Sequence, residues 1–156
     1  MSAVMTGETF ILSDRVYDVR VSPADDLRAA AVTVTLDGRF EWSLTVPGWR
    51  GVSLGASGET GYLWSAREVI VLPRAADAEL QVIRVDEDLL SAFRVDDGWL
   101  VICETSVRRL VGVVETARVE LGDVVEVARW EGGVLLVRDA GGEDLALRVD
   151  GEHLIV

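Results

Sequence analysis

The side chains in this chain that could do chemistry are mainly carboxylates that stand together in the sequence. The groups are Asp25-Asp26, Asp86-Glu87-Asp88, Asp96-Asp97, and Glu143-Asp144 with the nearby Asp139. Neighbouring carboxylates can exchange protons in acid–base catalysis or supply oxygen ligands to Ca²⁺. None of the groups has the D-x-D-x-D-G spacing of a calcium loop, and each adjoins a predicted turn, where Asp satisfies backbone groups. We interpret them as turn residues and keep Asp139, Glu143 and Asp144 as candidates for a cation or a bound partner.

Cys103 and His153 are the single cysteine and the single histidine of the chain. A nucleophilic thiolate requires an accessible, cationic setting, whereas Cys103 ends the apolar run Trp99–Cys103, so we predict a buried cysteine. One histidine cannot build a His-rich metal site, and we predict that His153 lies at the surface or at a sheet edge. No set of residues converges on a catalytic, metal or cofactor site. The sequence therefore predicts a protein that is not an enzyme and has no cofactor.

Trp49 is the aromatic residue that we most expect to bind a ligand at the protein surface, because it lies in the predicted loop Pro47-Gly48-Trp49-Arg50-Gly51. Together with Arg50 it could bind a carbohydrate, another small ligand or a peptide. Trp42, Trp99 and Trp130 are instead explained by pairing in the core.

The charge balance limits the class of partner. Fifteen basic residues, all arginine, stand against 27 acidic ones in 156 residues, which gives a net charge of −12. Nucleic acids and anionic membranes are disfavoured, because binding to phosphates requires a basic patch. A basic protein partner is compatible. The apolar runs are far shorter than the roughly 20 residues of a membrane helix, and the first residues lack a basic start and an apolar stretch. We expect a cytoplasmic protein.

Short β-rich runs separated by Gly and Asp make up most of the chain. Only residues 23–30 and 75–80 could hold a short helix or a turn. Many short strands with turn residues between them predict an all-β protein of antiparallel hairpins, in the form of a sandwich, a barrel or a propeller-like array.

Two hairpins can be aligned by their turns. With Asp96-Asp97-Gly98 as a three-residue loop, Val95 lies opposite Trp99, and glycine occupies the left-handed position of the loop. A shift of 35 residues gives a second hairpin, in which Glu131-Gly132-Gly133 is the loop and Trp130 lies opposite Val134. Because this shift keeps one large and one β-branched residue in each pair, we interpret the hairpins as an internal repeat.

A third hairpin follows from the alternation in Phe40-Glu41-Trp42-Ser43-Leu44. A slip of one residue would move every side chain to the wrong face. We therefore predict Asp37-Gly38-Arg39 as a three-residue loop or a bulge, with Val34 opposite Trp42 and Leu36 opposite Phe40.

Four units, at residues 17–50, 51–85, 88–121 and 123–156, would account for most of a single all-β domain. At this level the sequence resembles β-propeller blades, and Asp18-Val19-Arg20-Val21-Ser22-Pro23 looks like the strand-and-turn opening of WD40-like and TolB-like blades. The chain contains no Gly-His pair and no Trp-Asp dipeptide. The resemblance implies a propeller-like or partial propeller fold, with a β-sandwich as the alternative.

Three hypotheses of function remain. The first is a non-catalytic protein–protein interaction module with an acidic surface, for example an antidote of the immunity type or a regulator that binds a basic protein, since opposite charge speeds encounter. The second is a structural module that self-assembles into homo-oligomers through edge strands such as Leu154-Ile155-Val156. The third is a small-ligand or carbohydrate binder at Trp49.

Overall fold

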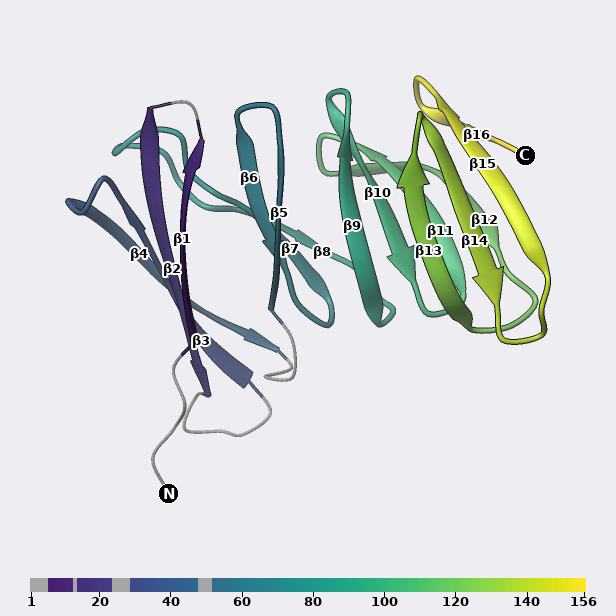
Figure 1. The fold of residues 1–156 in the computed structure, drawn as a ribbon, viewed down its shortest axis with the longest axis horizontal. Helices are drawn as coiled ribbons and strands as arrows, with labels where there is room; N and C mark the ends of the chain where they lie inside the picture. The colour runs from purple at the N-terminus through teal and green to yellow at the C-terminus, as the bar shows by residue number, and fades with distance from the viewer. Residues whose placement is uncertain (1–5, 13, 24–28, 48–51) are drawn as a thin grey trace. The chain divides into compact units, whose positions relative to one another are not determined.

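The computed structural model describes residues 6–12, 14–23, 29–47 and 52–156, and every regular element in them is a β-strand (Figure 1). The first eight strands are β1 (Thr6–Leu12), β2 (Arg15–Pro23), β3 (Ala29–Leu36), β4 (Phe40–Pro47), β5 (Ser53–Ser57), β6 (Thr60–Trp64), β7 (Glu68–Val71) and β8 (Gln81–Arg84). The next eight are β9 (Leu89–Val95), β10 (Gly98–Cys103), β11 (Ser106–Val111), β12 (Val114–Glu120), β13 (Val125–Glu131), β14 (Val134–Asp139), β15 (Asp144–Asp150) and β16 (His153–Ile155). The prediction of an all-β chain is confirmed. Within residues 75–80, residues 75–78 form a turn, in which Ala78 N donates to Ala75 O (3.1 Å).

Each group of four consecutive strands forms one antiparallel sheet with the strands in chain order, so the sheets are β1–β4, β5–β8, β9–β12 and β13–β16. Sheets of four antiparallel strands are what β-propeller blades are made of, and in the described residues no sheet closes on itself. The chain divides into two compact units, Met1–Asp86 and Glu87–Val156. The first sheet already begins at Thr6, ahead of the first predicted unit, and the four unit boundaries stay a prediction.

In the first unit, the sheet β1–β4 packs one face against the sheet β5–β8. Val32, Val34 and Leu36 alternate with threonine along β3 and are buried with Leu63 and Ile70 of the second sheet. The strict alternation of apolar and polar residues is typical of a sheet that has one face in a core and one face in water. It explains why the polar side chains of β3 and β4 point outward.

The hairpin β3–β4 has the predicted register. Leu36 pairs with Phe40, and Val34 pairs with Trp42. Residues 37–39 form the turn, and Arg39 N donates to Leu36 O (3.1 Å). The three-residue loop is confirmed.

Two aromatic side chains of the first sheet also hydrogen-bond to the second half of this unit. The buried Tyr17 hydroxyl donates to Pro73 O (2.8 Å), and Trp42 Nε1 donates to Ala78 O (3.1 Å). A buried Tyr or Trp needs a partner for its polar atom, and here each polar atom fixes a loop that follows β7.

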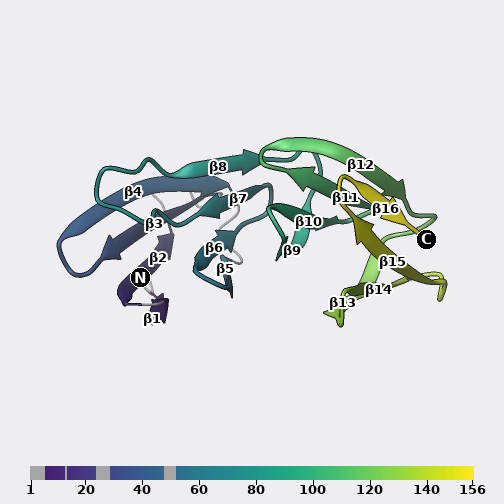
Figure 2. The same ribbon diagram turned by 90° about the horizontal axis from the view of Figure 1, so that it is seen from above.

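In the second unit, the sheets β9–β12 and β13–β16 share a core. Leu100, Ile102 and Val107 from the third sheet pack with Leu135 and Leu147 from the fourth. Figure 2 shows β16 beside β12, where the outer edges of these two sheets come into contact.

The predicted register of the other two hairpins is wrong by one residue. Both turns have two residues, so Trp99 pairs with Arg94 rather than with Val95, and Trp130 pairs with Leu135 rather than with Val134. All six residues of β10 are buried. When both faces of a strand are covered, apolar residues occupy consecutive positions, and the pattern no longer indicates which residues share a face.

The two hairpins do repeat, but at an offset of 36 rather than 35. The bounds of β9 and β10 correspond to those of β13 and β14 (89 to 125, 95 to 131, 98 to 134 and 103 to 139). Each first strand has a register irregularity at its second position, at Leu90 and at Glu126. Bulges are built-in features of sheets, and their shared position supports a common structural plan.

Gly98 is required for a reason other than the predicted one. Its φ is not positive; the left-handed residue of this turn is Asp96, with φ 53°. A Cβ at Gly98 would lie 2.1 Å from Leu110 O and 2.8 Å from Arg109 Nη1. The glycine therefore permits a close approach of two backbones and a buried guanidinium group.

Candidate functional site

Some predicted site residues fall outside the described part of the chain. These are Trp49 and Arg50, together with the pair Asp25-Asp26. The ligand-binding hypothesis at Trp49 stays a prediction.

Asp139, Glu143 and Asp144 lie together where β14 turns into β15. Asp139 is only 6 % exposed, and its Oδ1 accepts a hydrogen bond from Glu143 N (2.9 Å). Asp144 accepts hydrogen bonds at Oδ1 and Oδ2 from Arg138 Nε (2.8 Å) and Nη2 (3.2 Å). The hydrogen bonds from Arg138 lower the pKa of the exposed Asp144 carboxyl. Asp139 and Asp144 are therefore engaged within the protein, and Glu143 is left with an exposed carboxylate.

The two other chemically distinctive residues lie where they were predicted. Cys103 is completely buried, and His153 is exposed on β16 at the edge of the fourth sheet. Among the described residues, no three side chains of His, Cys, Asp or Glu form a group that could hold a metal ion. No helix of the described residues is long and apolar enough to cross a membrane.

Glu87 forms a polar cluster that sequence reasoning missed. Its carboxylate accepts hydrogen bonds from Thr105 N, from Ser106 Oγ (2.9 Å) and from Arg108 Nη2 (2.9 Å). Arg108 is 4 % exposed. Burial alone would raise the pKa of Glu87, but these hydrogen bonds outweigh it and hold the pKa below its ordinary value. The cluster joins the segment before β9 to the loop between β10 and β11, so its role is to fix these loops.

The loops at this end of the second unit are joined by backbone hydrogen bonds and carry exposed acidic residues. Glu104 N donates to Asp88 O, Val125 N donates to Glu104 O, and Ala140 N donates to Val124 O, each at 2.8 Å. These backbone bonds join successive loops into one row at the lower end of the unit in Figure 1.

We name this surface the acidic loop end and define it by four exposed residues, Asp88, Glu104, Asp123 and Glu143. The carboxylate of Asp123 lies close to Gly141, because a Cβ there would be 3.6 Å from Asp123 Oδ2. Within the described ranges, Glu104, Asp123 and Glu143 form no ion pair. These three carboxylates of the acidic loop end therefore offer negative charge to a partner.

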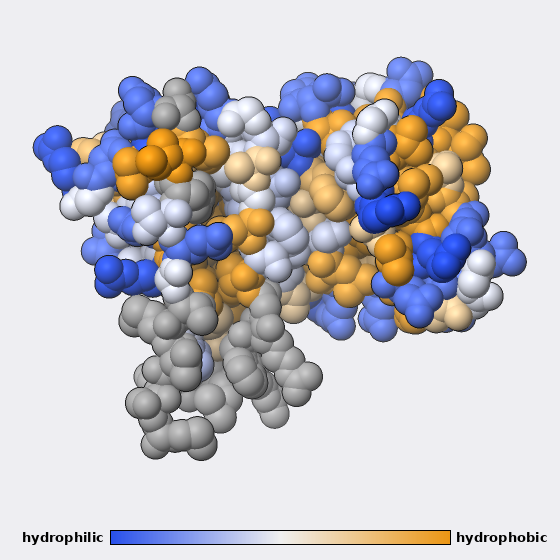
Figure 3. All heavy atoms as spheres, in the orientation of Figure 1, coloured by the Kyte–Doolittle hydropathy of each residue, from blue (hydrophilic) through white to orange (hydrophobic). Residues whose placement is uncertain are grey.

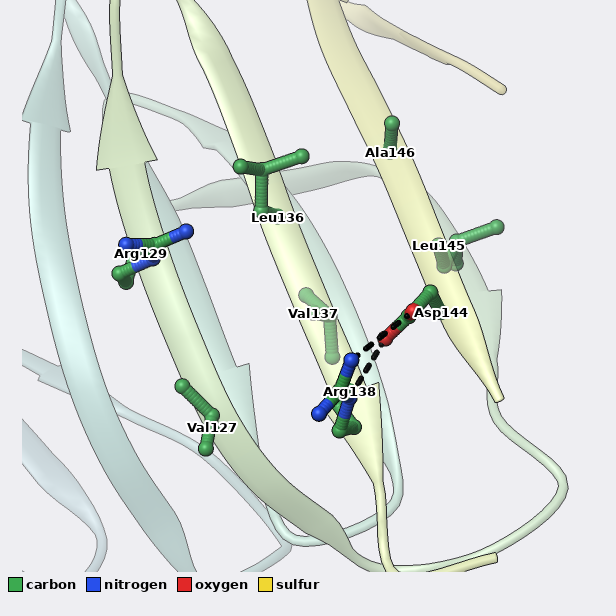
Figure 4. A pocket seen from close by; sticks show the side chains of 8 residues that line it. All are labelled: Val127, Arg129, Leu136, Val137, Arg138, Asp144, Leu145 and Ala146. Atoms are coloured by element: carbon green, nitrogen blue, oxygen red, sulfur yellow. Dashed lines mark hydrogen bonds and ion pairs between the residues drawn. The ribbon is translucent and has the colours of Figure 1, made fainter. Parts of the chain in front are cut away.

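A second surface lies on the opposite side of the fourth sheet from the core. A hollow of about 560 Å³ lies in this outward face, and Figure 4 shows the side chains that line it. The residues that line it are Val127, Arg129, Leu136, Val137, Arg138, Asp144, Leu145 and Ala146. In Figure 3, orange atoms interrupted by blue ones cover this part of the second unit. The surface combines aliphatic side chains with guanidinium groups.

The comparisons with known proteins add little about function. No protein-family model and no curated protein sequence matches the chain. Among solved structures, a crystal structure of HIRA(644-1017) is similar, with a TM-score of 0.48 and 11 % sequence identity. The match covers 94 % of this chain and 50 % of that chain, so the chain spans half the length of the solved structure. A likeness at this level carries no argument about activity or partners. What the chain itself shows is a set of antiparallel four-stranded sheets of the blade type.

Proposed function

We propose that this chain is a non-catalytic protein–protein interaction module that binds a basic partner protein through its acidic loop end. The observation that carries the proposal is the row of exposed carboxylates on loops that are joined by backbone hydrogen bonds. Loops fixed in this way lose little conformational entropy when a partner binds, and preorganised surfaces bind more tightly for that reason.

The electrostatics favour a cationic partner. The chain carries a net charge of −12, and a negative field of this kind speeds encounter with a positive surface and slows encounter with a negative one. Arginine side chains compensate carboxylates elsewhere in the second unit, as in the pairs Arg138–Asp144 and Arg118–Glu115. Glu104, Asp123 and Glu143 are left available for the guanidinium and ammonium groups of another protein.

A sharper form of the proposal is an antidote of the immunity type, which would block a basic toxin or nuclease, or a regulator that acts on a basic protein. Both forms require the same contact: lysine and arginine side chains of the partner against the carboxylates of the acidic loop end. The partner's own activity then distinguishes an antidote from a regulator.

The test uses a panel of small basic proteins and an arginine-rich peptide as probes, with binding measured by calorimetry over a range of salt concentrations. We expect binding that weakens steeply as salt rises, because the charges are exposed and screened. A triple variant, Glu104→Gln, Asp123→Asn and Glu143→Gln, should bind about tenfold more weakly or worse, a change of about 1.4 kcal/mol.

The matched control removes the same amount of charge from the first unit, through Asp14→Asn, Asp77→Asn and Glu79→Gln, which are all exposed. It should retain most of the affinity. Equal losses in the two triple variants would show that only net charge matters, and binding that is insensitive to salt would likewise contradict the proposal.

A further inference from the structure

An apolar strip crosses the outward face of the fourth sheet and takes one residue from each strand. The residues are Val127 of β13, Leu136 of β14, Ala146 of β15 and Ile155 of β16. Val127, Leu136 and Ile155 are 48 %, 37 % and 47 % exposed, and Ala146 is also exposed. Isolated surface aliphatics are common, whereas apolar side chains that gather on one sheet face form a candidate contact surface.

The outward face of the first sheet serves for comparison, because it is solvent-exposed and mainly polar. By the register of β2–β4, its outward positions hold Thr33, Thr35, Ser43 and Thr45, with Asp18 beside Thr35. On this face, Ile11 of β1 and its partner Val16 are an isolated aliphatic pair, and no aliphatic strip crosses the described residues of β2–β4. The outward face of the fourth sheet differs in that one aliphatic residue of each strand contributes to its strip.

We propose that the outward face of β13–β16 is a homodimer interface, on which the apolar strip of one copy packs against the same strip of a second copy. Sheets pack face to face when apolar side chains of both can interdigitate. This contact is separate from the acidic loop end and does not depend on the function proposed for that surface.

The charges beside the strip favour a second copy as the occupant. Arg129, Arg138 and Arg148 share this face with Glu131, Asp144 and Asp150, so its charge is nearly balanced in a chain of net charge −12. Two strongly acidic copies repel each other over most of their surface, and they can approach only where cations offset the carboxylates.

A two-fold arrangement that superposes the strips places carboxylates of one copy near guanidinium groups of the other. Arg129 and Asp144 lie on opposite sides of the strip, on β13 and β15 (Figure 4). When two copies face each other along the strip, Arg129 approaches the partner's Asp144, and the reciprocal pair forms at the same time. A single asymmetric face thus becomes self-complementary.

The size of the face sets the strength of the contact. Four strands at about 4.8 Å spacing and about six residues at 3.3 Å rise give a flat face of about 400 Å² in each copy. Two such faces together bury about 800 Å² when each is treated as flat. This area is below the roughly 1,200 Å² of a stable standard interface. We therefore expect a reversible dimer that forms at micromolar or higher concentration.

The test is sedimentation velocity of the full chain over a wide concentration range, at low and at high salt. We expect a monomer–dimer equilibrium that persists at high salt, since burial of the strip and not charge supplies most of the attraction. Leu136→Asp should weaken the dimer about tenfold or more, because it would bury a carboxylate at the centre of the contact. Val113→Asp, at an exposed aliphatic in the β11–β12 turn, is the matched control and should leave the equilibrium unchanged.

A second measurement covers the case in which Leu136→Asp does not fold. Amide hydrogen exchange of the unaltered chain at high and low concentration should show added protection confined to β13–β16. A strict monomer at all concentrations, open-ended polymers, or protection elsewhere in the chain would each overturn the proposal. Loss of salt-sensitive binding to basic probes, with the dimer intact, would count against the acidic loop end alone.

Discussion

The guanidinium carbon of Arg94 lies 5.0 Å from the centroid of the Trp99 ring, across the β9–β10 hairpin. A cation over an indole face is attracted by the negative potential of the ring. This pair takes the place of the Val95–Trp99 contact that the turn residues predicted. It provides one reason why an arginine stands in an otherwise apolar stretch of β9.

Replacing Arg94 tests the contribution of this pair. We expect Arg94→Ala to lower the free energy of unfolding by about 1 kcal/mol, the size of a partly desolvated cation–π contact. Chemical denaturation measures the change. Arg20→Ala, at an exposed position of β2, should change stability by less than about 0.5 kcal/mol; similar values for the two variants would remove the special role of the ring.

Gly98→Ala should be among the most damaging small substitutions in the chain. The added Cβ would lie 2.1 Å from the carbonyl oxygen of Leu110, so two paired strands would have to separate. We expect a loss of about 3 kcal/mol or more, or failure to fold, from overpacking of backbone against backbone.

Gly133→Ala is the informative comparison for Gly98. Gly133 has φ 79° with open space around it, so only the left-handed backbone is penalised, by roughly 1–2 kcal/mol. Thermal unfolding of the two variants side by side separates the steric cost from the conformational cost. Equal melting temperatures would contradict the explanation given for Gly98.

Glu87 should make stability depend on pH in the acid range. Its pKa in the folded protein lies below the ordinary value of 4.5, so its contribution is fully present above that value and is lost as the pH falls through the lower folded pKa. At neutral pH, Glu87→Gln should cost about 3 kcal/mol, because the buried Arg108 loses the nearer of two charged partners and keeps only the more distant Glu115.

Urea denaturation at a series of pH values checks this expectation. The difference between the wild type and Glu87→Gln should shrink as the pH is lowered. Glu120→Gln, which alters an exposed ion pair with Arg118, should cost less than about 1 kcal/mol. A constant difference at all pH values would show that Glu87 does not act through its charge.

Tyr17→Phe tests the link between the two sheets of the first unit. The substitution removes the buried hydrogen bond from the Tyr17 hydroxyl to Pro73 O, and the carbonyl is left without that donor. We expect a loss of about 1–2 kcal/mol in the free energy of unfolding. No measurable loss would indicate that water replaces the hydroxyl.

The accuracy of the sequence predictions followed the burial of each strand. The β3–β4 register was predictable because Val34 and Leu36 alternate with threonine on strands that have one solvent-exposed face. The β9–β10 and β13–β14 registers were not, because Trp99–Cys103 is buried on both faces and Leu135 and Leu136 are equally apolar neighbours. Periodicity distinguishes the two faces of a strand only when one of them is polar.

The surfaces were harder to predict than the fold. The apolar strip uses residues 9 or 10 positions apart on four strands (127, 136, 146 and 155), and only the correct registers bring them together. Glu87 and Arg108 are likewise 21 residues apart and meet through a loop. The acidic composition motivated the proposal of a basic partner, but it did not indicate the loops on which the carboxylates are gathered.

Because Cys103 is buried, the rate at which its thiol reacts measures how often the structure around it opens. As the sole sulfhydryl in the chain, it reacts with a thiol reagent only after β10 is released, so the labelling rate reports how often that strand opens. The same property leaves the folded surface without a reactive thiol. A cysteine introduced at any exposed position would then accept a dye or a cross-linker at one defined place.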